Sequence, residues 1–535
     1  MVNDKPSELE ASRFAVQSTF GADEDDIGTV VAQGYSAWFR DQLQRQATSH
    51  EERISGIDFR EPRQRHIVDS WWVSTVDDED QLRQRMAFAL SQIFVISYDG
   101  GAQFEAAIQY TDMLNRSAFG NFRDLLESVT YSQAMGRYLT YAGNQKANPQ
   151  AGTVPDENYA REILQLFSIG LVELNPDGTE KRGADGQSVE IYGNEDIIQL
   201  SKVFTGLSYP TGRFRDGSYT PRNEERYGPL KVFPQFHDTT AKTVLGRRIP
   251  AGQSTEKDID DALDIIFEHP NVGPFIGKQL IQRFVTSNPS PAYVARVTQA
   301  FDQGGAALPD GSRVGTGQRG DLAATLAAVL FDPEARDMNF ADAEDFGKVR
   351  EPLLRIAQWL HAFDRPRDGL PQSGKDGTLI GTDRFRFLQE PTSVAQMAYR
   401  SPSVFNFYRP GYVDPGGATG GQGLLSPELQ ITNAATIVGY LNLMHNYIEN
   451  GFPGNSGFFQ DYSDEAALAE DPQALVEHLD TLLTYGRMSD ETKQRIVEAV
   501  NAVAIDASNR PNSRNRRARL AITMAVSSPE YITQQ

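Results

Sequence analysis

Residues 82–97 restrict the fold more than any other stretch, because they read as a helix with apolar residues around most of its circumference. A helix that is hydrophobic on nearly all sides has to be surrounded by other elements of the protein. The chain therefore needs a large helical core around this segment. Arg83 and Arg85 lie near its start, and we expect both to form ion pairs at the protein surface.

The composition is that of a large globular protein. A chain of 535 residues can bury a substantial core and form more than one subdomain. No apolar run is long enough to span a bilayer. The net charge of −21 disfavours nucleic-acid binding, which needs a basic surface. The sequence has no cysteine, which excludes disulfides, zinc–thiolate sites, iron–sulfur clusters and cysteine nucleophiles.

The pattern of helical segments predicts a mainly α protein: a large multi-helix globular domain with long ordered loops, a small β-hairpin excursion and a C-terminal helical subdomain. We expect a main domain over residues 1–450, with hairpin or loop insertions at about 171–193 and 208–255. Asp-Gly pairs at 177–178 and 185–186 are turn signals within the first insertion. An acidic stretch at 451–473 is predicted to be a linker, and 474–535 a helical tail that packs on the main domain.

Residues 156–170 are predicted to form one amphipathic helix that begins near a capping pair, Thr153 and Asp156, and ends at Gly170. Two stripes run along it with helical spacing. The apolar stripe is expected to face the core, and the polar stripe carries many hydrogen-bonding groups. The apolar stripe comprises Tyr159, Ile163, Leu166 and Phe167, and the polar stripe comprises Asn158, Arg161, Glu162 and Gln165.

The polar stripe has two interpretations. Glu157 precedes Arg161 by four residues, which is the favourable order for an ion pair, and a carboxylate beside a buried arginine is usually a structural brace. Alternatively, the stripe lines a pocket in which Glu162 is a general acid or base and Arg161 orients an anionic or hydroxyl group. The sequence leaves both interpretations open.

His237 and Asp238 are the best candidates for a second acid–base pair, although a neighbouring His and Asp in a loop more often form a structural contact. The seven histidines are scattered, so the sequence predicts no metal ligands. The Gly-rich segment at 315–320 lacks the preceding strand of a dinucleotide site. A calcium loop at 175–186 fails on the positions of its glycine and glutamate. The sequence identifies no cofactor.

Several segments, in order along nearly the whole chain, resemble one bacterial family, the domain of unknown function DUF1800. Many relatives have a histidine-containing segment where this chain has residues 91–94, so a mechanism that needs this histidine does not carry over. The resemblance rests on residues 11–21 (ASRFAVQSTFG), 83–95 (RQRMAFALSQIFV), 157–170 (ENYAREILQLFSIG), 237–242 (HDTTAK), 269–283 (HPNVGPFIGKQLIQR), 347–352 (GKVREP), 401–411 (SPSVFNFYRPG) and 528–531 (SPEY).

The resemblance implies a mainly α-helical protein that is often exported, with genes that often neighbour a second uncharacterised family, DUF1501. It implies no established activity. The N-terminus lacks the apolar centre of a signal peptide. We therefore expect a periplasmic or secreted protein whose export signal has been removed, or a cytoplasmic protein if Met1 is the native start.

Three functions remain open. The first is a hydrolase or lyase on a saccharide or other polymer, with Glu162, Arg161, His237 and Asp238 as catalytic residues. The second is a non-catalytic binding or assembly protein that partners a DUF1501-type protein. The third is a metal or redox protein that uses His237, Asp238 and Glu162. Polar residues in the recognised segments are the candidate binding residues: Asn158, Glu157, Lys242, Arg350, Glu351, Asn406 and Arg409.

Overall fold

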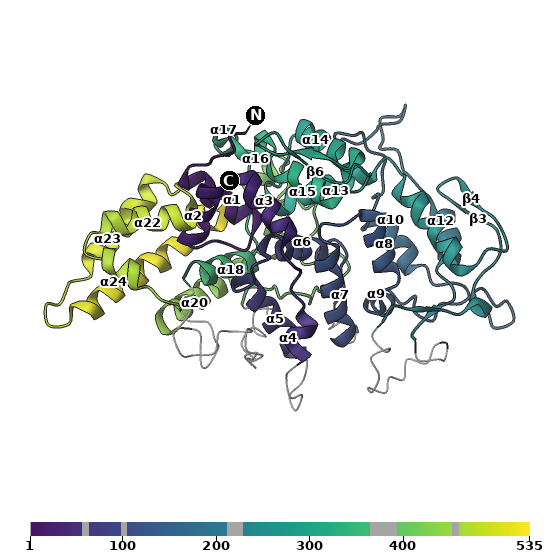
Figure 1. Ribbon diagram of the computed structural model, residues 1–535, viewed down its shortest axis with the longest axis horizontal. Helices are drawn as coiled ribbons and strands as arrows, with labels where there is room; N and C mark the ends of the chain where they lie inside the picture. Colours follow the sequence, from purple (N-terminus) through teal and green to yellow (C-terminus); the bar gives the residue numbers. More distant parts are fainter. Residues whose placement is uncertain are drawn as a thin grey trace.

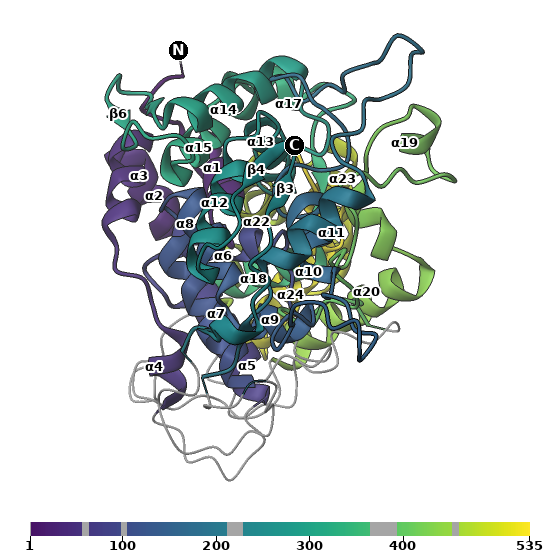
Figure 2. The ribbon, with the colours of Figure 1, turned by 90° about the vertical axis from the view of Figure 1, so that its right-hand side faces the viewer.

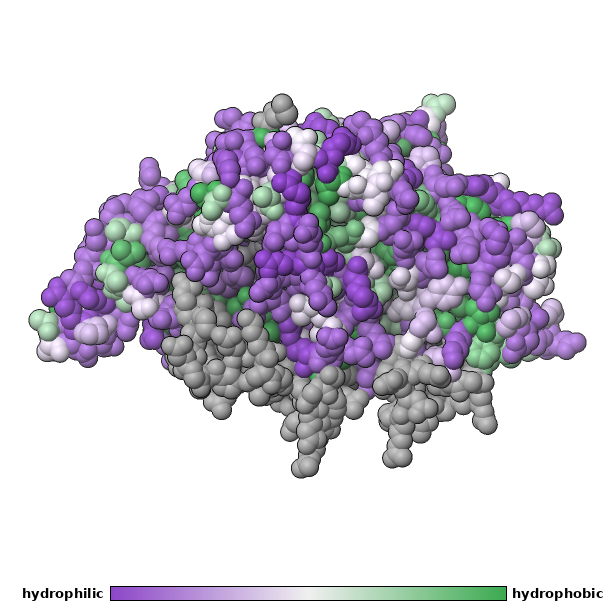
Figure 3. Space-filling view, in the orientation of Figure 1, coloured by the Kyte–Doolittle hydropathy of each residue, from purple (hydrophilic) through white to green (hydrophobic). Residues whose placement is uncertain are grey.

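The computed structural model describes residues 2–55, 64–97, 104–210, 214, 228–363, 393–451 and 460–535. Within these ranges helices dominate, and the strands form only two-stranded antiparallel sheets. The mainly α fold predicted from the sequence is confirmed. No helix in the described ranges combines the length and the apolar character needed to cross a bilayer. The face in Figure 3 is mainly hydrophilic, with hydrophobic residues in separate patches.

The N-terminal part of the chain packs around α6 (Gln81–Ser91), which lies near the centre of the molecule in Figure 1. Every residue of α6 up to Leu90 is buried, as its apolar circumference predicts, but the helix ends at Ser91 and not near residue 97. The helices that pack directly on it are α1 (Glu8–Ser18), α3 (Tyr35–Gln44), α5 (Gln64–Val76) and α7 (Phe104–Ser117). The other helices of this part are α2 (Glu24–Gln33), α4 (His50–Ser55), α8 (Phe122–Thr130) and α9 (Gln133–Tyr138).

The expectation of surface ion pairs for Arg83 and Arg85 is wrong, because both side chains are buried. The guanidinium of Arg83 lies 4.5 Å from the ring centre of Phe119 and donates to the Asn115 carbonyl. The guanidinium of Arg85 lies 4.5 Å from the ring centre of Phe284. Aromatic faces and backbone carbonyls replace the carboxylates that a surface arginine would use.

The predicted helix at 156–170 is present but shorter. Helix α10 spans Asn158–Gln165, and the chain then turns, with the amides of Ile169 and Gly170 both donating to the Leu164 carbonyl. Gly170 has φ of 77°, as the predicted C-terminal glycine requires. The Thr153 cap is not found: the first turn is held by Asp156, whose Oδ1 accepts from the Asn158 amide at 2.8 Å.

The chain between α10 and α12 (Thr255–Phe267) contains the hairpin-like excursion that the Asp-Gly pairs predict. Bridges join Val172 to Glu190, Leu174 to Glu180 and Arg182 to Ser188. Helix α11 (Asn194–Val203) follows and packs on α10, as Figure 2 shows. The strands of this region pair as β1 (Leu207–Ser208) with β2 (Lys231–Val232) and β3 (Lys242–Val244) with β4 (Arg247–Ile249), with a short 3₁₀ turn η2 (Pro234–Phe236) between β2 and β3.

A second group of helices, at the top of Figure 1, packs α13 against α14 and α15. Its last strand, β7 (Lys348–Val349), pairs with β8 (Thr533–Gln534) close to the C-terminus, so that residues about 185 apart in sequence lie side by side. The elements are α12 (Thr255–Phe267), α13 (Val272–Phe284), α14 (Pro291–Gln303), β5 (Ala306–Ala307), β6 (Arg313–Val314), α15 (Leu322–Leu330), α16 (Pro333–Arg336), α17 (Met338–Ala341), β7 (Lys348–Val349) and α18 (Pro352–Phe363).

The C-terminal helices form the lobe at the left of Figure 1 and pack on α1 and α18. Part of the predicted linker is folded: α21 (Ser463–Leu468) lies within 451–473 and packs on α24, with Ala466 buried. Residues 452–459 of that stretch lie outside the described ranges. The elements are α19 (Ala418–Gly421), η4 (Pro427–Ile431), α20 (Ala434–Asn450), α22 (Pro472–Thr484), α23 (Asp490–Ala502), α24 (Arg510–Val526), α25 (Pro529–Ile532) and β8 (Thr533–Gln534).

Candidate functional site

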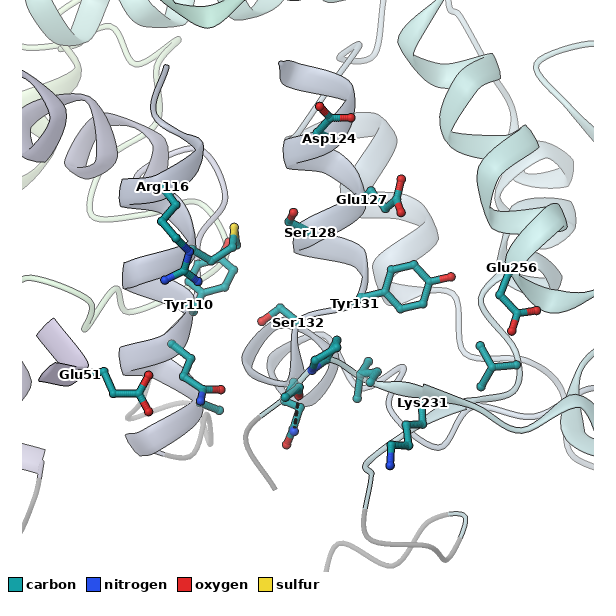
Figure 4. Close-up of a pocket in the computed structure, with 18 residues that line it drawn as sticks. Glu51, Tyr110, Arg116, Asp124, Glu127, Ser128, Tyr131, Ser132, Lys231 and Glu256 are labelled. Atoms are coloured by element: carbon teal, nitrogen blue, oxygen red, sulfur yellow. Dashed lines mark hydrogen bonds between the residues drawn. The ribbon is translucent and has the colours of Figure 1, made fainter. Parts of the chain in front are cut away.

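An open cavity of about 960 Å³ lies between α7, α8, β2 and the start of α12. In Figure 4, Asp124 and Glu127 lie along the helix in the middle of the view, with Tyr131 below them and Glu256 on α12 at the right. Glu127 is already paired, because Arg123 donates to its carboxylate at 2.7 Å. None of the predicted site residues lines this hollow in the described structure. Dispersed surface carboxylates of this kind do not indicate a particular chemistry.

A second open cavity, of about 670 Å³, has the composition of a ligand site. We call it the cleft. It is formed mainly by four parts of the chain: the residues just after α6, residues 165–180, one side of α13 and residues 404–413, with Leu425 also in the lining. Its volume lies in the range of pockets that hold a small molecule. Because the four parts are far apart in sequence, only the folded chain brings them together.

The walls of the cleft are largely apolar. Leu171 is 53% exposed and is one of the few large apolar side chains at the described surface with that much exposure. Its position explains this exposure, since Leu171 lines the cleft and does not face the surrounding core. Apolar walls gain free energy when a ligand removes them from water. The other apolar wall residues include Ile93, Leu166, Val172, Phe275, Phe405 and Tyr412.

Helix α13 supplies the polar side of the cleft. Lys278, Gln279, Gln282 and Arg283 fall at positions that share one side of a helix, and all four line the cleft. Burial lowers the pKa of Lys278, which has no hydrogen bond or ion pair among the described residues. Burial also lowers the pKa of Arg283. Nε2 of Gln279 and Nε of Arg283 are buried without a hydrogen-bond partner.

Behind this polar side lies a buried network centred on Glu351, one of the predicted binding residues. Glu351 Oε2 accepts hydrogen bonds from Gln92 Nε2 at 2.6 Å, from Tyr408 Oη at 2.8 Å and from Gln396. Burial raises the pKa of Tyr408 well above its usual value, so its hydroxyl remains a donor. Glu351 does not line the cleft itself. It positions Gln92, which does.

Glu162 is half-buried, and burial raises the pKa of its carboxyl group. Its Oε2 is enclosed and has no hydrogen-bond partner in the described structure. Its charge acts on Tyr138 and Tyr192; burial, with a smaller effect of Glu162, raises the pKa of Tyr138 to about 12. Glu162 does not line the cleft, but Gln165 and Leu166, three and four residues further along the chain, do. Glu162 therefore lies one turn from the cleft on the same side of α10.

The rest of the polar stripe is at the surface. Arg161 pairs with Glu157 at 3.3 Å, as the spacing predicts, but both side chains are more than a third exposed, and such a pair contributes little stability. Asn158 is exposed and donates to Thr140 Oγ1 at 2.8 Å. Arg161 therefore points to Glu157 and not to an enclosed pocket.

His237 forms its carboxylate contact with Asp258 and not with its neighbour Asp238. Its Nε2 lies 2.9 Å from Asp258 Oδ2, and its Nδ1 lies 2.9 Å from the Thr205 carbonyl. The ammonium of Lys242 reaches the same Asp258 oxygen at 2.5 Å. The three side chains are sealed from solvent, at 1%, 0% and 1% exposure for His237, Lys242 and Asp258.

The buried contacts among His237, Lys242 and Asp258 give two of the predicted site residues, His237 and Lys242, a structural role. Burial alone would raise the pKa of Asp258, but hydrogen bonds from His237, Gln253 and Lys242 lower it. Asp238 accepts from the Thr240 amide at 2.9 Å in a local turn. No hydrogen bond or ion pair of the described residues links His237 or Asp238 to Glu162 or Arg161. The predicted convergence of the four catalytic candidates is therefore not found.

The remaining binding candidates divide between core and cleft. Arg350 is buried, donates to the Tyr531 carbonyl at 3.3 Å and lies 5.1 Å from the Tyr531 ring centre, which fixes the C-terminus to α18. Asn406 has φ of 62° and accepts from Ser401 Oγ at 3.1 Å. Arg409 lines the cleft, with its guanidinium 4.6 Å from the Phe405 ring centre.

The comparisons with other proteins give one match. No curated protein and no solved structure matches the chain. A family model described as a protein of unknown function, DUF1800, matches residues 13–533, which is nearly the whole chain. The match includes all four parts that form the cleft. The chain therefore belongs to the DUF1800 family.

Proposed function

We propose that the protein is a binding protein that holds a small amphipathic ligand in the cleft. The observation that carries this proposal is one cavity of about 670 Å³ with apolar walls and with buried polar atoms that have no partner. Cavities of this size with a few convergent polar groups are the usual form of small-molecule sites.

The unpartnered atoms are Gln92 Oε1, Gln279 Nε2 and Arg283 Nε, all on side chains that line the cleft. Leaving a buried donor or acceptor unpaired costs about 1–3 kcal/mol. Three such groups beside one cavity are a substantial cost for a fold to retain. These atoms are closed to solvent, so a ligand or water in the cleft would pair with them only after the side chains shift. Such pairing would offset this cost, and a ligand would also cover the apolar walls.

Gly411 allows a direct test because it lines the cleft and an added Cβ would meet nothing within 4 Å. The Gly411→Trp variant fills the cleft with little local strain. Gly28→Trp is the matched control, since Gly28 is an exposed helical position with equally open surroundings, outside the cleft. The fluorescent probe N-phenyl-1-naphthylamine should bind saturably to wild type and to Gly28→Trp. Equal affinity for Gly411→Trp would overturn the proposal.

A second candidate function, an acid–base hydrolase or lyase, is supported by Glu162. A carboxyl group with a raised pKa and an enclosed, unpartnered oxygen can hold a proton that a substrate then takes. Its place one turn from Gln165 puts it near a ligand in the cleft. A panel of glycan and ester substrates should then show turnover that Glu162→Gln loses while probe binding is kept. Equal turnover by both proteins would remove Glu162 as an acid or base.

An extracytoplasmic location and a DUF1501-type partner are proposals that rest on the family resemblance. They are compatible with a binding role, because a carrier of a small ligand delivers it to another protein. Co-purification with a DUF1501-type protein from the same genome tests the partner. Absence of complex formation between the two purified full-length proteins at micromolar concentration would contradict it.

A further inference from the structure

The charges that line the cleft differ in sign from the rest of the protein. The whole chain carries 72 acidic and 51 basic residues, a net charge of −21. The cleft is lined by three cationic side chains, Lys278, Arg283 and Arg409, and by one carboxylate, Glu180. Glu180 already pairs with Arg182 at 3.1 Å. The charge of Glu180 also acts on Lys278, without a direct ion pair, so the lining has one carboxylate for three cations.

Lys278 is the most informative of the three. Its ammonium is half-buried on α13, and none of the residues that the structure describes gives it a hydrogen bond or an ion pair. A desolvated ammonium without a direct ion pair is unfavourable, and burial lowers the pKa of Lys278 although the charge of Glu180 acts to raise it. An anion in the cleft would restore the missing partner.

Arg283 also has no carboxylate partner in the described structure. Its two terminal nitrogens donate to backbone carbonyls, of Gln279 at 2.9 Å and Gln92 at 3.1 Å, and its Nε is free. Two buried carboxylates act on it from a distance: Glu428, which pairs with Lys348 at 3.0 Å, and Glu351 behind the cleft. The hydrogen bonds of the guanidinium itself all go to neutral carbonyls, so Arg283 has no direct ion pair beside the cavity.

Arg409 places the third positive charge at the rim. Its guanidinium lies over the ring of Phe405, another residue of the cleft, and no ion pair of the described residues involves it. A stacked arginine keeps its edge nitrogens available for a carboxylate, sulfonate or phosphate. Positive groups around a cavity with low-dielectric walls raise the local concentration of anions.

We propose that the ligand of the cleft is an organic anion, with an apolar body against Leu171 and Phe275 and a charged group held by Lys278, Arg283 and Arg409. This inference rests on the binding function proposed above and specifies the chemical class of its ligand. The apolar walls account for the apolar body of the ligand. The three cationic side chains, which have no direct ion pair among the described residues, account for its negative charge. A small inorganic anion would satisfy the cations but leave the walls in contact with water.

Two probes with the same aromatic rings separate the charge from the body. Anilinonaphthalene-8-sulfonate carries a sulfonate, and N-phenyl-1-naphthylamine does not. The neutral probe is the more apolar of the two, so a cleft that recognised only apolar surface would bind it more tightly. We expect the full-length wild type to bind the sulfonate at least about tenfold more tightly. Added salt should weaken binding of the sulfonate and leave the neutral probe almost unaffected.

Two variants test the assignment to the cleft. Lys278→Met keeps the length of the side chain and removes the charge, and it should abolish the preference for the sulfonate. Lys257→Met, at an exposed lysine of α12 outside the cleft, should keep it. Arg409→Gln, at the rim, serves as a second charge variant if Lys278→Met unfolds. Competition by dodecanoate and by dodecyl phosphate then distinguishes a carboxylate from a phosphate ligand.

The outcomes separate the two proposals. If Gly411→Trp abolishes binding of the neutral probe but wild type binds the sulfonate probe no more tightly than the neutral one, the anion inference is overturned and the binding function stands. If the preference exists but survives in both Lys278→Met and Arg409→Gln, the anion inference is also overturned. If neither probe responds to Gly411→Trp, both proposals fail.

Discussion

The side-chain amide of Gln92 donates a hydrogen bond of 2.6 Å to Oε2 of Glu351, which joins the end of α6 to the residue that precedes α18. Gln92 lines the cleft, whereas Glu351 lies behind it with 1% exposure. The cleft is therefore supported by contacts between the ends of two buried helices, α6 and α18. Its geometry depends on a carboxylate that a ligand does not touch.

Glu351→Gln should destabilise the protein and weaken binding of the neutral probe. Three donors share the Glu351 carboxylate, and an amide in its place adds a donor to a site that needs acceptors. The new amide nitrogen is then a buried donor without an acceptor, at a cost of about 1–3 kcal/mol in the free energy of unfolding. Urea unfolding measures this, with Glu344→Gln at the exposed Glu344 as control. Unchanged stability would show that Glu351 has no supporting role.

Asp258→Asn should be much more destabilising than Asp260→Asn on the same helix. Asp258 is the counter-charge of the buried Lys242, so its loss leaves an uncompensated ammonium in the core. Breaking a buried pair in this way costs about 3–5 kcal/mol, whereas the partly exposed Asp260 contributes at most about 1 kcal/mol. Thermal or urea unfolding of the two variants measures the difference. Equal stabilities would contradict the structural role assigned to His237, Lys242 and Asp258.

The His361 and Asp26 pair predicts a pH dependence. Burial alone would lower the pKa of His361, but the hydrogen bond and charge of Asp26, at 2.7 Å, raise it to about 9. A pKa raised on folding gives stability that is complete below the unfolded value of about 6.5 and is lost as the pH rises through 9. Solvent screening at the half-exposed Asp26 limits the contribution to on the order of 1–2 kcal/mol.

The measurement for this pair is the difference in unfolding free energy between wild type and His361→Gln, taken at several pH values from 6 to 10. Groups that titrate identically in both proteins cancel in this difference. The difference should be largest near pH 6 and small near pH 10. A difference that grows with pH would contradict the direction of the pKa shift.

Gly170→Ala should cost more than Gly186→Ala, although both glycines have φ close to 78°. A Cβ at Gly170 would lie 2.9 Å from the ring of Phe275, whereas a Cβ at Gly186 would meet nothing within 4 Å. The left-handed backbone costs each variant about 1 kcal/mol, and only Gly170→Ala also displaces a wall residue of the cleft. Weaker probe binding in Gly170→Ala alone is expected; equal effects of both changes would argue against contact between Gly170 and Phe275.

Much of the fold follows from the sequence, because helical periodicity is a local property. The apolar circumference of α6 predicts its burial, and Gly170 predicts the end of the turn after α10. The same local view fails for Arg83 and Arg85. Periodicity does not reveal that aromatic rings and backbone carbonyls from distant segments will receive their guanidinium groups.

The candidate site is less predictable for a related reason. The partner of His237 is Asp258, 21 residues further along the chain. Asp258 lies in the first turn of α12, where acidic residues are common, so the sequence does not single it out. The cleft is formed mainly by four segments that are far apart in the sequence. Only the folded structure shows that its three cationic side chains have no direct ion pair among the described residues. Of the predicted residues, Arg409 lines the cleft and Glu351 supports it, while Glu162 lies one turn away.

The dissociation constant of N-phenyl-1-naphthylamine, measured side by side for wild type, Gly411→Trp and Gly28→Trp, tests the binding account most directly. The account predicts equal values for wild type and Gly28→Trp and a value at least about tenfold higher for Gly411→Trp. The same dissociation constant for all three proteins would contradict it, because the probe would then bind somewhere other than the cleft.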